Sequence, residues 1–259
     1  MDLQIAGKRA LVCGASKGLG YACAAALCRE GVHVTLVARS VSTLQEAAGR
    51  MAAGASGRID IVAADVTTPA GREAMLEVCD APDILITNAA GPAPGDFRTW
   101  TLDTWHQALN ANMLSAIELI RLTVDPMIRN RFGRIVNITS GAVKAPIPAL
   151  GLSNGARAGL TGFVGGLARQ VAPHNVTINN LLPGFFATDR LAATVDYMAR
   201  QAGTSAETFR QQHVAAIPAG RYGLPEEFGA TCAFLCSAWS AYLTGQNILL
   251  DGGCYPGTF

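Results

Sequence analysis

Charged residues are scarce in this sequence. Only 15% of the 259 residues are Asp, Glu, Lys or Arg, and the formal net charge is +1, whereas an ordinary soluble domain carries about 25% charged residues. This shortage indicates more buried surface than a monomer would have, and so predicts an oligomer. No block of like charges occurs, which argues against binding to nucleic acid or to a membrane surface. Because half of the residues are apolar, disorder is excluded as well.

Paired cysteines, long apolar runs and targeting segments are also missing. The seven cysteines include no C-x-x-C and no spacing typical of a zinc site or a disulfide framework, so we expect free, buried thiols in a reducing compartment. The histidines have no partners at metal-binding spacing, and we predict no metal. No apolar run approaches about 18 residues, and the opening MDLQIAG lacks the basic and apolar regions of a signal peptide. We therefore expect a cytoplasmic globular protein with no membrane span.

Short β-branched runs alternate with longer helical segments from end to end. Strands are predicted at residues 9–13, 33–38, 59–64, 83–87, 134–138, 176–181 and 246–250. Helices are predicted at residues 19–30, 102–130, 154–171 and 226–237. Gly31 is expected to close the first helix, Ser42 to cap the helix after the second strand, and Pro225 to open the last helix. The long helix should bend or end near Pro126.

Strands that alternate with helices predict right-handed crossovers and a parallel sheet covered on both faces. The expected fold class is therefore α/β: a Rossmann-type, doubly wound, seven-stranded parallel sheet with helices on both faces. We expect one domain over residues 1–259. The more polar segment 188–219 interrupts the alternation and is interpreted as an insertion that forms a substrate loop.

A glycine cluster, GASKGLG at residues 14–20, stands between the first strand and the first helix. Glycines at this point allow a tight turn and let backbone N–H groups approach a diphosphate at a helix N-terminus. The position between first strand and first helix makes the motif much more specific than glycines alone. It predicts dinucleotide binding.

The end of the second strand indicates which dinucleotide is bound. An acidic residue there usually binds the ribose hydroxyls of NAD, whereas a basic residue accommodates the 2′-phosphate of NADP. Here the strand is followed by Arg39, which can offer a planar fork to phosphate, and Lys17 in the glycine loop adds a second positive charge. These two residues favour NADP(H) over NAD(H).

With these motifs in place, the chain resembles the short-chain dehydrogenase/reductase family, and 3-oxoacyl-ACP reductases in particular, over nearly its whole length. The loop matches T-G-x-x-x-G-x-G with Cys13 in place of the threonine, residues 87–90 match N-N-A-G with two changes, and residues 251–253 match the C-terminal D-G-G. The resemblance implies a dimer or tetramer, with helices 102–130 and 154–171 at an interface, and a small carbonyl or alcohol substrate. Together with the loop, it assigns cofactor binding to Gly14, Ser16, Lys17, Gly18, Leu19, Gly20, Arg39, Ser40, Asp65, Val66, Asn88, Ala89, Arg157, Pro183, Gly184 and Thr188.

The resemblance breaks at the family's Y-x-x-x-K motif, which lies on the helix after the fifth strand. Thirteen residues beyond Ser140, the position of the catalytic serine, stands Ser153, and four further on stands Arg157. A serine hydroxyl is a much weaker acid than a phenol and reaches less far. An arginine keeps the positive charge but stays protonated, so it cannot pass a proton along. The four-residue spacing still puts both side chains on one helix face.

Three functions remain open at this stage. The favoured one is an NADP(H)-dependent oxidoreductase with an altered active site, whose catalytic residues are Asn112, Ser140, Ser153 and Arg157. Losing one general acid typically slows a reaction by about 10²–10⁴-fold without abolishing it. The alternatives are a non-redox enzyme of lyase or isomerase type on the same fold, and a catalytically silent protein that binds a dinucleotide or another ligand. A fold analogy by itself does not decide among them.

Overall fold

A computed structural model of the chain describes residues 1–258. Its centre is one seven-stranded sheet with the order β3-β2-β1-β4-β5-β6-β7 and every neighbouring pair parallel, which confirms the predicted fold class. The strands are β1 (Arg9–Cys13), β2 (His33–Ala38), β3 (Ile59–Ala63), β4 (Ile84–Thr87), β5 (Gly133–Ile138), β6 (Val176–Pro183) and β7 (Asn247–Leu250). The strand order reverses between β1 and β4, the place where open α/β sheets bind their ligands.

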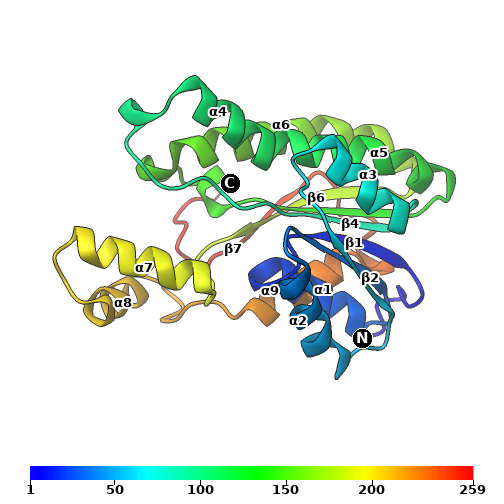
Figure 1. Cartoon of the computed structure of the whole chain (residues 1–259), viewed down its shortest axis with the longest axis horizontal. Coiled ribbons are helices and arrows are strands. Elements are labelled where there is room, and N and C mark those ends of the chain that lie inside the picture. The colour runs from blue at the N-terminus through cyan, green and yellow to red at the C-terminus, as the bar shows by residue number, and fades with distance from the viewer. Residues whose placement is uncertain (259) are drawn as a thin grey trace.

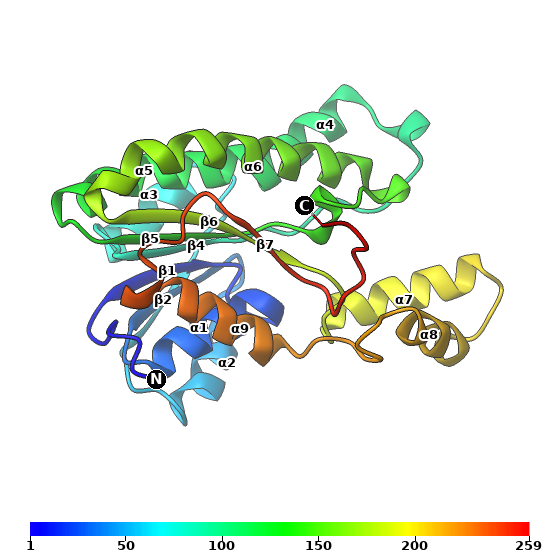
Figure 2. The same cartoon turned by 180° about the vertical axis from the view of Figure 1, so that it is seen from behind.

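Helices cover both faces of the sheet, as Figure 1 and the reverse view in Figure 2 show. One layer contains α3 (Pro69–Val78), α4 (Leu102–Leu109), α5 (Ser115–Arg129) and α6 (Gly151–Val171). The other contains α1 (Gly18–Arg29), α2 (Val41–Ala52) and α9 (Pro225–Leu235). The central strands β4 and β5 are buried along their whole length, because a parallel sheet covered on both faces leaves neither side to water.

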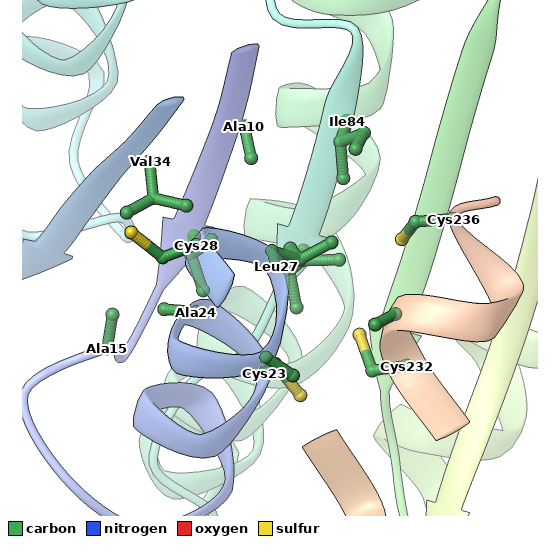
Figure 3. Close-up of a cluster of buried hydrophobic side chains, with 14 of the residues drawn as sticks. Ala10, Ala15, Cys23, Ala24, Leu27, Cys28, Val34, Ile84, Cys232 and Cys236 are labelled. Atoms are coloured by element: carbon green, nitrogen blue, oxygen red, sulfur yellow. The ribbon is translucent and has the colours of Figure 1, made fainter. Parts of the chain in front are cut away.

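The layer below the sheet in Figure 1 is held together by close packing of α1 against α9. Figure 3 shows Cys23 of α1 and Cys232 of α9 in this core, with Cys236 following α9. Gly229 makes the contact possible, since a Cβ there would collide with the Ala22 carbonyl. All the cysteines are free and all but Cys254 are buried, as predicted for a chain without disulfides.

The long helical segment ends at Arg129, three residues after Pro126, which lies inside α5. A π-helical turn at Asn110–Leu114, which the sequence did not indicate, separates α4 from α5. The predicted cap of α2 is wrong. The cap of α2 is Ser40, whose Oγ accepts a hydrogen bond from the Thr43 N–H at 3.4 Å, and not Ser42. Ser42 is instead inside the first turn, where its Oγ lies 3.0 Å from that of Ser40.

The polar segment that interrupts the alternation forms two further helices, α7 (Asp189–Gln201) and α8 (Ala206–Ala215). They follow β6 and project from the body of the molecule beside the end of the sheet (Figure 1). Within residues 1–258, no helix is both long and apolar enough to cross a membrane.

Candidate active site

The glycine loop follows β1 at the edge where the parallel strands end. Gly14 has a φ of +60°, a conformation that glycine adopts without the steric penalty of a Cβ. A Cβ at Gly14 would lie 2.6 Å from Asn88 Nδ2, and one at Gly20 would collide with the Gly14 carbonyl oxygen. The loop therefore packs directly on the residue that follows β4, and the two predicted cofactor segments meet.

The start of α1 leaves its amides free for a ligand. Lys17 occupies the cap position in extended conformation and makes no side-chain capping bond, whereas Ser40, Thr68 and Thr188 cap α2, α3 and α7 with their hydroxyls. Above Gly18 there is space: outside the loop and its helix, the Thr188 methyl is the one described group within 4 Å of where a Cβ would be, at 3.8 Å. The first turn thus has the unpartnered N–H groups and the positive dipole end that bind a phosphate.

The residues predicted to bind the adenosine half of the cofactor lie at the ends of β2 and β3. Arg39 and Lys17 are exposed, and neither belongs to an ion pair found among residues 1–258. Asp65 accepts hydrogen bonds from the backbone N–H and the hydroxyl of Thr67 at 2.9 and 2.7 Å. These bonds, with the charge of Arg39 as a smaller cause, lower the pKa of the Asp65 carboxyl.

A small cavity of about 20 Å³ joins the cofactor segments to the predicted catalytic residues. Val66, Asn88 and Ala89 line it from the cofactor side, and Asn112 and Arg157 from the catalytic side. Segments far apart in the sequence therefore form one site.

Asn112 reaches this cavity from the π-helical turn. Its Nδ2 donates to the carbonyls of Ala90 and Ala108 at 3.3 and 3.4 Å, while its Oδ1 is buried without a hydrogen-bond partner among the described residues. A π turn shifts side chains relative to a regular helix and is frequent at functional sites. A buried acceptor without a donor is rare, so this oxygen is suited to a bound donor such as a water or a hydroxyl.

Ser153 and Arg157 lie one turn apart on α6 and are in contact. Arg157 Nε donates to Ser153 Oγ at 3.1 Å, and Nη1 donates to the carbonyl of Ile138, the last residue of β5, at 2.8 Å. Both side chains are buried. Burial, with the charge of Arg190 as a smaller cause, lowers the pKa of Arg157 to about 10, so the guanidinium is still a cation at neutral pH.

The remaining predicted residues lie around the same edge. Ser140 follows β5, is half-buried, and its Oγ accepts the Ala142 N–H at 3.1 Å. Pro183 ends β6, and Gly184 packs so closely on Asp251 that a Cβ would lie 2.6 Å from the Asp251 Cβ. Thr188 caps α7 through the Leu191 N–H at 3.3 Å.

Arg190 is a residue of this region that the sequence analysis missed. It belongs to the first turn of α7, and its Nη2 donates to the Gly91 carbonyl at 3.5 Å across 99 residues of sequence. The only signal for it was its place two residues after Thr188. An isolated arginine in a polar segment is more often a solvated side chain.

Comparisons with known proteins agree with this architecture. A family model described as enoyl-(acyl carrier protein) reductase matches residues 14–255. The chain is similar to the 3-oxoacyl-(acyl-carrier-protein) reductase FabG of Vibrio cholerae, at 33% identity over 259 residues, covering 98% of this chain and 99% of the relative. It is 31% identical to the NADPH-dependent reductase BacG of Bacillus subtilis, covering 95% and 97%.

Among solved structures, L-sorbose reductase from Gluconobacter frateurii, crystallised with NADPH and L-sorbose, matches with a TM-score of 0.93 and 30% identity. The match covers 99% of this chain and 100% of the other. Sequence and fold agree over nearly the whole length, and the chain belongs to the short-chain dehydrogenase/reductase family.

Proposed function

We propose that this protein is an NADP(H)-dependent oxidoreductase that reduces the carbonyl group of a small molecule, with Ser153 and Arg157 in the place of the family's tyrosine and lysine. The observation that carries the proposal is the buried contact between Arg157 Nε and Ser153 Oγ at 3.1 Å, in a site that also contains Asn112 and the cofactor segment after β4. A charged donor and a hydroxyl are thus held together beside the cofactor segment, where they could both act on the oxygen of a bound substrate.

The residues of the glycine loop fit a dinucleotide. The loop has no room for side chains at Gly14 and Gly20 but is open at Gly18, and α1 begins with amides that no side chain caps. When bound, the cofactor supplies or accepts the hydride. Preference for NADP is supported by the exposed cations Arg39 and Lys17, and by relatives that are NADPH-dependent or crystallised with NADPH.

The chain's own residues would bind the carbonyl oxygen of the substrate and supply its proton. Because Ser153 Oγ accepts its hydrogen bond from Arg157, its own O–H is free to donate to the substrate oxygen. Arg157 stabilises negative charge that develops there, an electrostatic contribution that is strong in a buried site. Arg157 remains protonated, so the proton that replaces the one given by Ser153 comes from water. Ser140, which follows β5, is a second hydroxyl donor.

A homodimer or homotetramer is part of the same proposal. Phe163 of α6 and Leu114, between α4 and α5, are 36% and 47% exposed, large apolar side chains on the helices for which an interface is predicted. Burial of such side chains between copies would offset their exposure to water. Light scattering that finds a monomer at working concentration would contradict this assembly.

The function is tested by single-turnover oxidation of NADPH at high protein concentration with a panel of aldehydes and ketones. We expect slow but measurable turnover that falls at least tenfold in Ser153→Ala. Thr161→Ala, on the same helix, removes a hydroxyl whose one bond among residues 1–258 is to the Ala158 carbonyl, and it should leave the rate unchanged. NADPH binding without oxidation by any substrate would support a silent binding protein, and a reaction without NADPH consumption would support the non-redox enzyme.

A further inference from the structure

Lys144 places a positive charge beside the predicted catalytic serine. It comes four residues after Ser140, at the end of the short turn Gly141–Val143, and its backbone N–H donates to the Gly141 carbonyl at 2.9 Å. The side chain is half-buried. Its ammonium lies 5.7 Å from the centre of the Tyr255 ring, in the segment that follows β7. The lysine side chain therefore extends toward the β7 edge of the sheet.

This edge is the side of the site that a cofactor leaves free. The segments predicted to bind the diphosphate and the adenosine follow β1, β2, β3 and β4, whereas Ser140 follows β5. A Cβ on Gly141 would lie 3.3 Å from the Pro183 carbonyl oxygen, and Gly184 packs on Asp251. The ends of β5, β6 and β7 are therefore adjacent, and a substrate would reach Ser140 from the side of β7.

The tail that follows β7, residues 251–255, is fixed in place. The Asp251 carboxylate accepts the Tyr255 N–H at 2.8 Å. Gly252 has a φ of +67°, and its carbonyl accepts the N–H of Ala219, the last residue of the insertion, at 3.0 Å. Figure 2 shows the tail running from the end of β7 toward the layer that contains α4 and α6. The tail thus gives the Tyr255 ring a defined place beside the turn after β5.

The charge of Lys144 is not balanced by an acidic side chain. No ion pair found among residues 1–258 includes it, and the two carboxylate oxygens of Asp251 accept the N–H groups of Gly253 and Tyr255. An aromatic face attracts an ammonium without occupying its N–H groups as an oxygen acceptor would. These N–H groups are thus available to an anionic group that enters from the β7 side.

We propose that Lys144 is a specificity-determining residue, which binds a carboxylate or a phosphate at the end of the substrate remote from the reacting carbonyl. Both anions offer oxygen acceptors for the charge-assisted hydrogen bonds of an ammonium. The diphosphate of the cofactor has its own partners in the glycine loop and the uncapped start of α1, so it does not compete for Lys144. This inference rests on the proposed function.

The test is calorimetric titration of the NADP⁺-loaded protein with matched pairs of carbonyl compounds. 4-Oxopentanoate and 4-formylbenzoate are each compared with their methyl esters, and dihydroxyacetone phosphate with dihydroxyacetone. We expect at least one anion to bind tenfold or more tightly than its neutral partner, and the pair with the largest ratio identifies the anion as carboxylate or phosphate. Lys144→Met should reduce that ratio to within threefold, and Lys144→Arg should keep part of it, while the affinity for NADP⁺ stays within twofold.

Lys8→Met is the matched control. The Lys8 ammonium also lies over an aromatic ring, 4.2 Å from the centre of Phe132, but Lys8 precedes β1 and Phe132 precedes β5. This contact is therefore at the opposite edge of the sheet from Ser140. Removing its charge should leave the ratio of anion to neutral affinity unchanged, and an equal fall of that ratio in both variants would overturn the site by assigning the preference to overall charge.

The outcomes separate this inference from the proposed function. Anions that bind with the expected preference but oxidise no NADPH would contradict the reductase and leave the site in place. If no anion binds more tightly than its neutral partner, or if the preference survives in Lys144→Met, the site is overturned whether or not the compounds are reduced. A loss of NADP⁺ affinity in Lys144→Met that exceeds the loss of anion affinity would assign Lys144 to the cofactor, and would also overturn it.

Discussion

Replacing Ser153 by tyrosine and Arg157 by lysine together should accelerate carbonyl reduction. A phenol beside an ammonium is a far better proton donor than the serine hydroxyl, and one general acid is worth about 10²–10⁴-fold in rate, or roughly 3–5 kcal/mol of barrier. Asn112 already lines the site, and Ser140 follows β5 at the same edge of the sheet. We therefore expect a gain of roughly 10²-fold in the single-turnover rate of NADPH oxidation.

The stability cost of that double change can be worked out from the contacts of Arg157. Its guanidinium makes two hydrogen bonds, to Ser153 Oγ and to the Ile138 carbonyl. A lysine in its place keeps at most the second, so one charge-assisted bond is lost, at about 1.5–3 kcal/mol. In a chain of this size that lowers the melting temperature by roughly 3–12 °C, which leaves a folded protein to assay at 25 °C.

The assay compares the parent, Ser153→Tyr and the double variant in single-turnover NADPH oxidation, with NADPH affinity and melting temperature measured on each. Ser153→Tyr alone should gain less, because Arg157 holds its position but cannot relay a proton. A double variant that binds NADPH like the parent and melts in the expected range, yet reduces no carbonyl faster, would refute the reasoning that a missing proton donor limits the reaction.

Three further predictions test the cofactor loop, its charges and the cap of α9. The parent should bind NADPH at least about tenfold more tightly than NADH, since one charge-assisted phosphate contact contributes about 1.4 kcal/mol or more. Arg39→Asp should abolish or reverse that preference. Equal affinities of the parent for NADPH and NADH in calorimetry would show that Arg39 does not contact the 2′-phosphate. Gly20→Ala should lower the free energy of unfolding in urea by about 1–3 kcal/mol, because the added Cβ meets the Gly14 carbonyl. The control, Gly49→Ala, lies in α2 with open space around it and should be neutral or stabilising. Equal effects of the two substitutions would contradict the close packing of the loop. Arg221, with the Leu224 N–H as a smaller cause, lowers the pKa of Glu227 from 4.5 to about 2. The stabilising contribution of the Glu227 carboxylate is therefore fully present above pH 4.5 and is lost as the pH falls toward 2. The difference in melting temperature between the parent and Glu227→Gln should shrink over that pH range, and a constant difference would contradict the ion pair.

Much of the fold could be predicted from local patterns. Strands such as β1 and β2 have the predicted bounds, because a buried parallel strand needs an unbroken apolar run that is visible in the sequence. The same holds for Gly31, whose φ of +80° is the left-handed conformation that glycine supplies after a helix. The glycine loop could be recognised because a tight turn followed by a helix start requires glycines at short spacing, and these are visible within a few residues of sequence.

Tertiary contacts decided what those patterns could not. Pro126 was expected to bend or end the long helix; α5 continues through it and ends three residues later, at Arg129. Packing of neighbours such as the buried Thr123 and Met127 stabilises the turn that lacks the backbone bond of Pro126. The π turn that carries Asn112 has no signature in its residue types, since it depends on which carbonyl each N–H finds.

In the candidate site, too, some features could be predicted from the sequence and others depend on the tertiary structure. The position of Ser153 and Arg157 on one helix face follows from the helical period alone, and side chains at that spacing are close enough to touch. That Arg190 would meet Arg157 at Gly91 could not be predicted, because the three residues come from α7, α6 and the loop after β4. Only the folded sheet brings the ends of its parallel strands to one edge, and the loops that follow those strands then form one charged site.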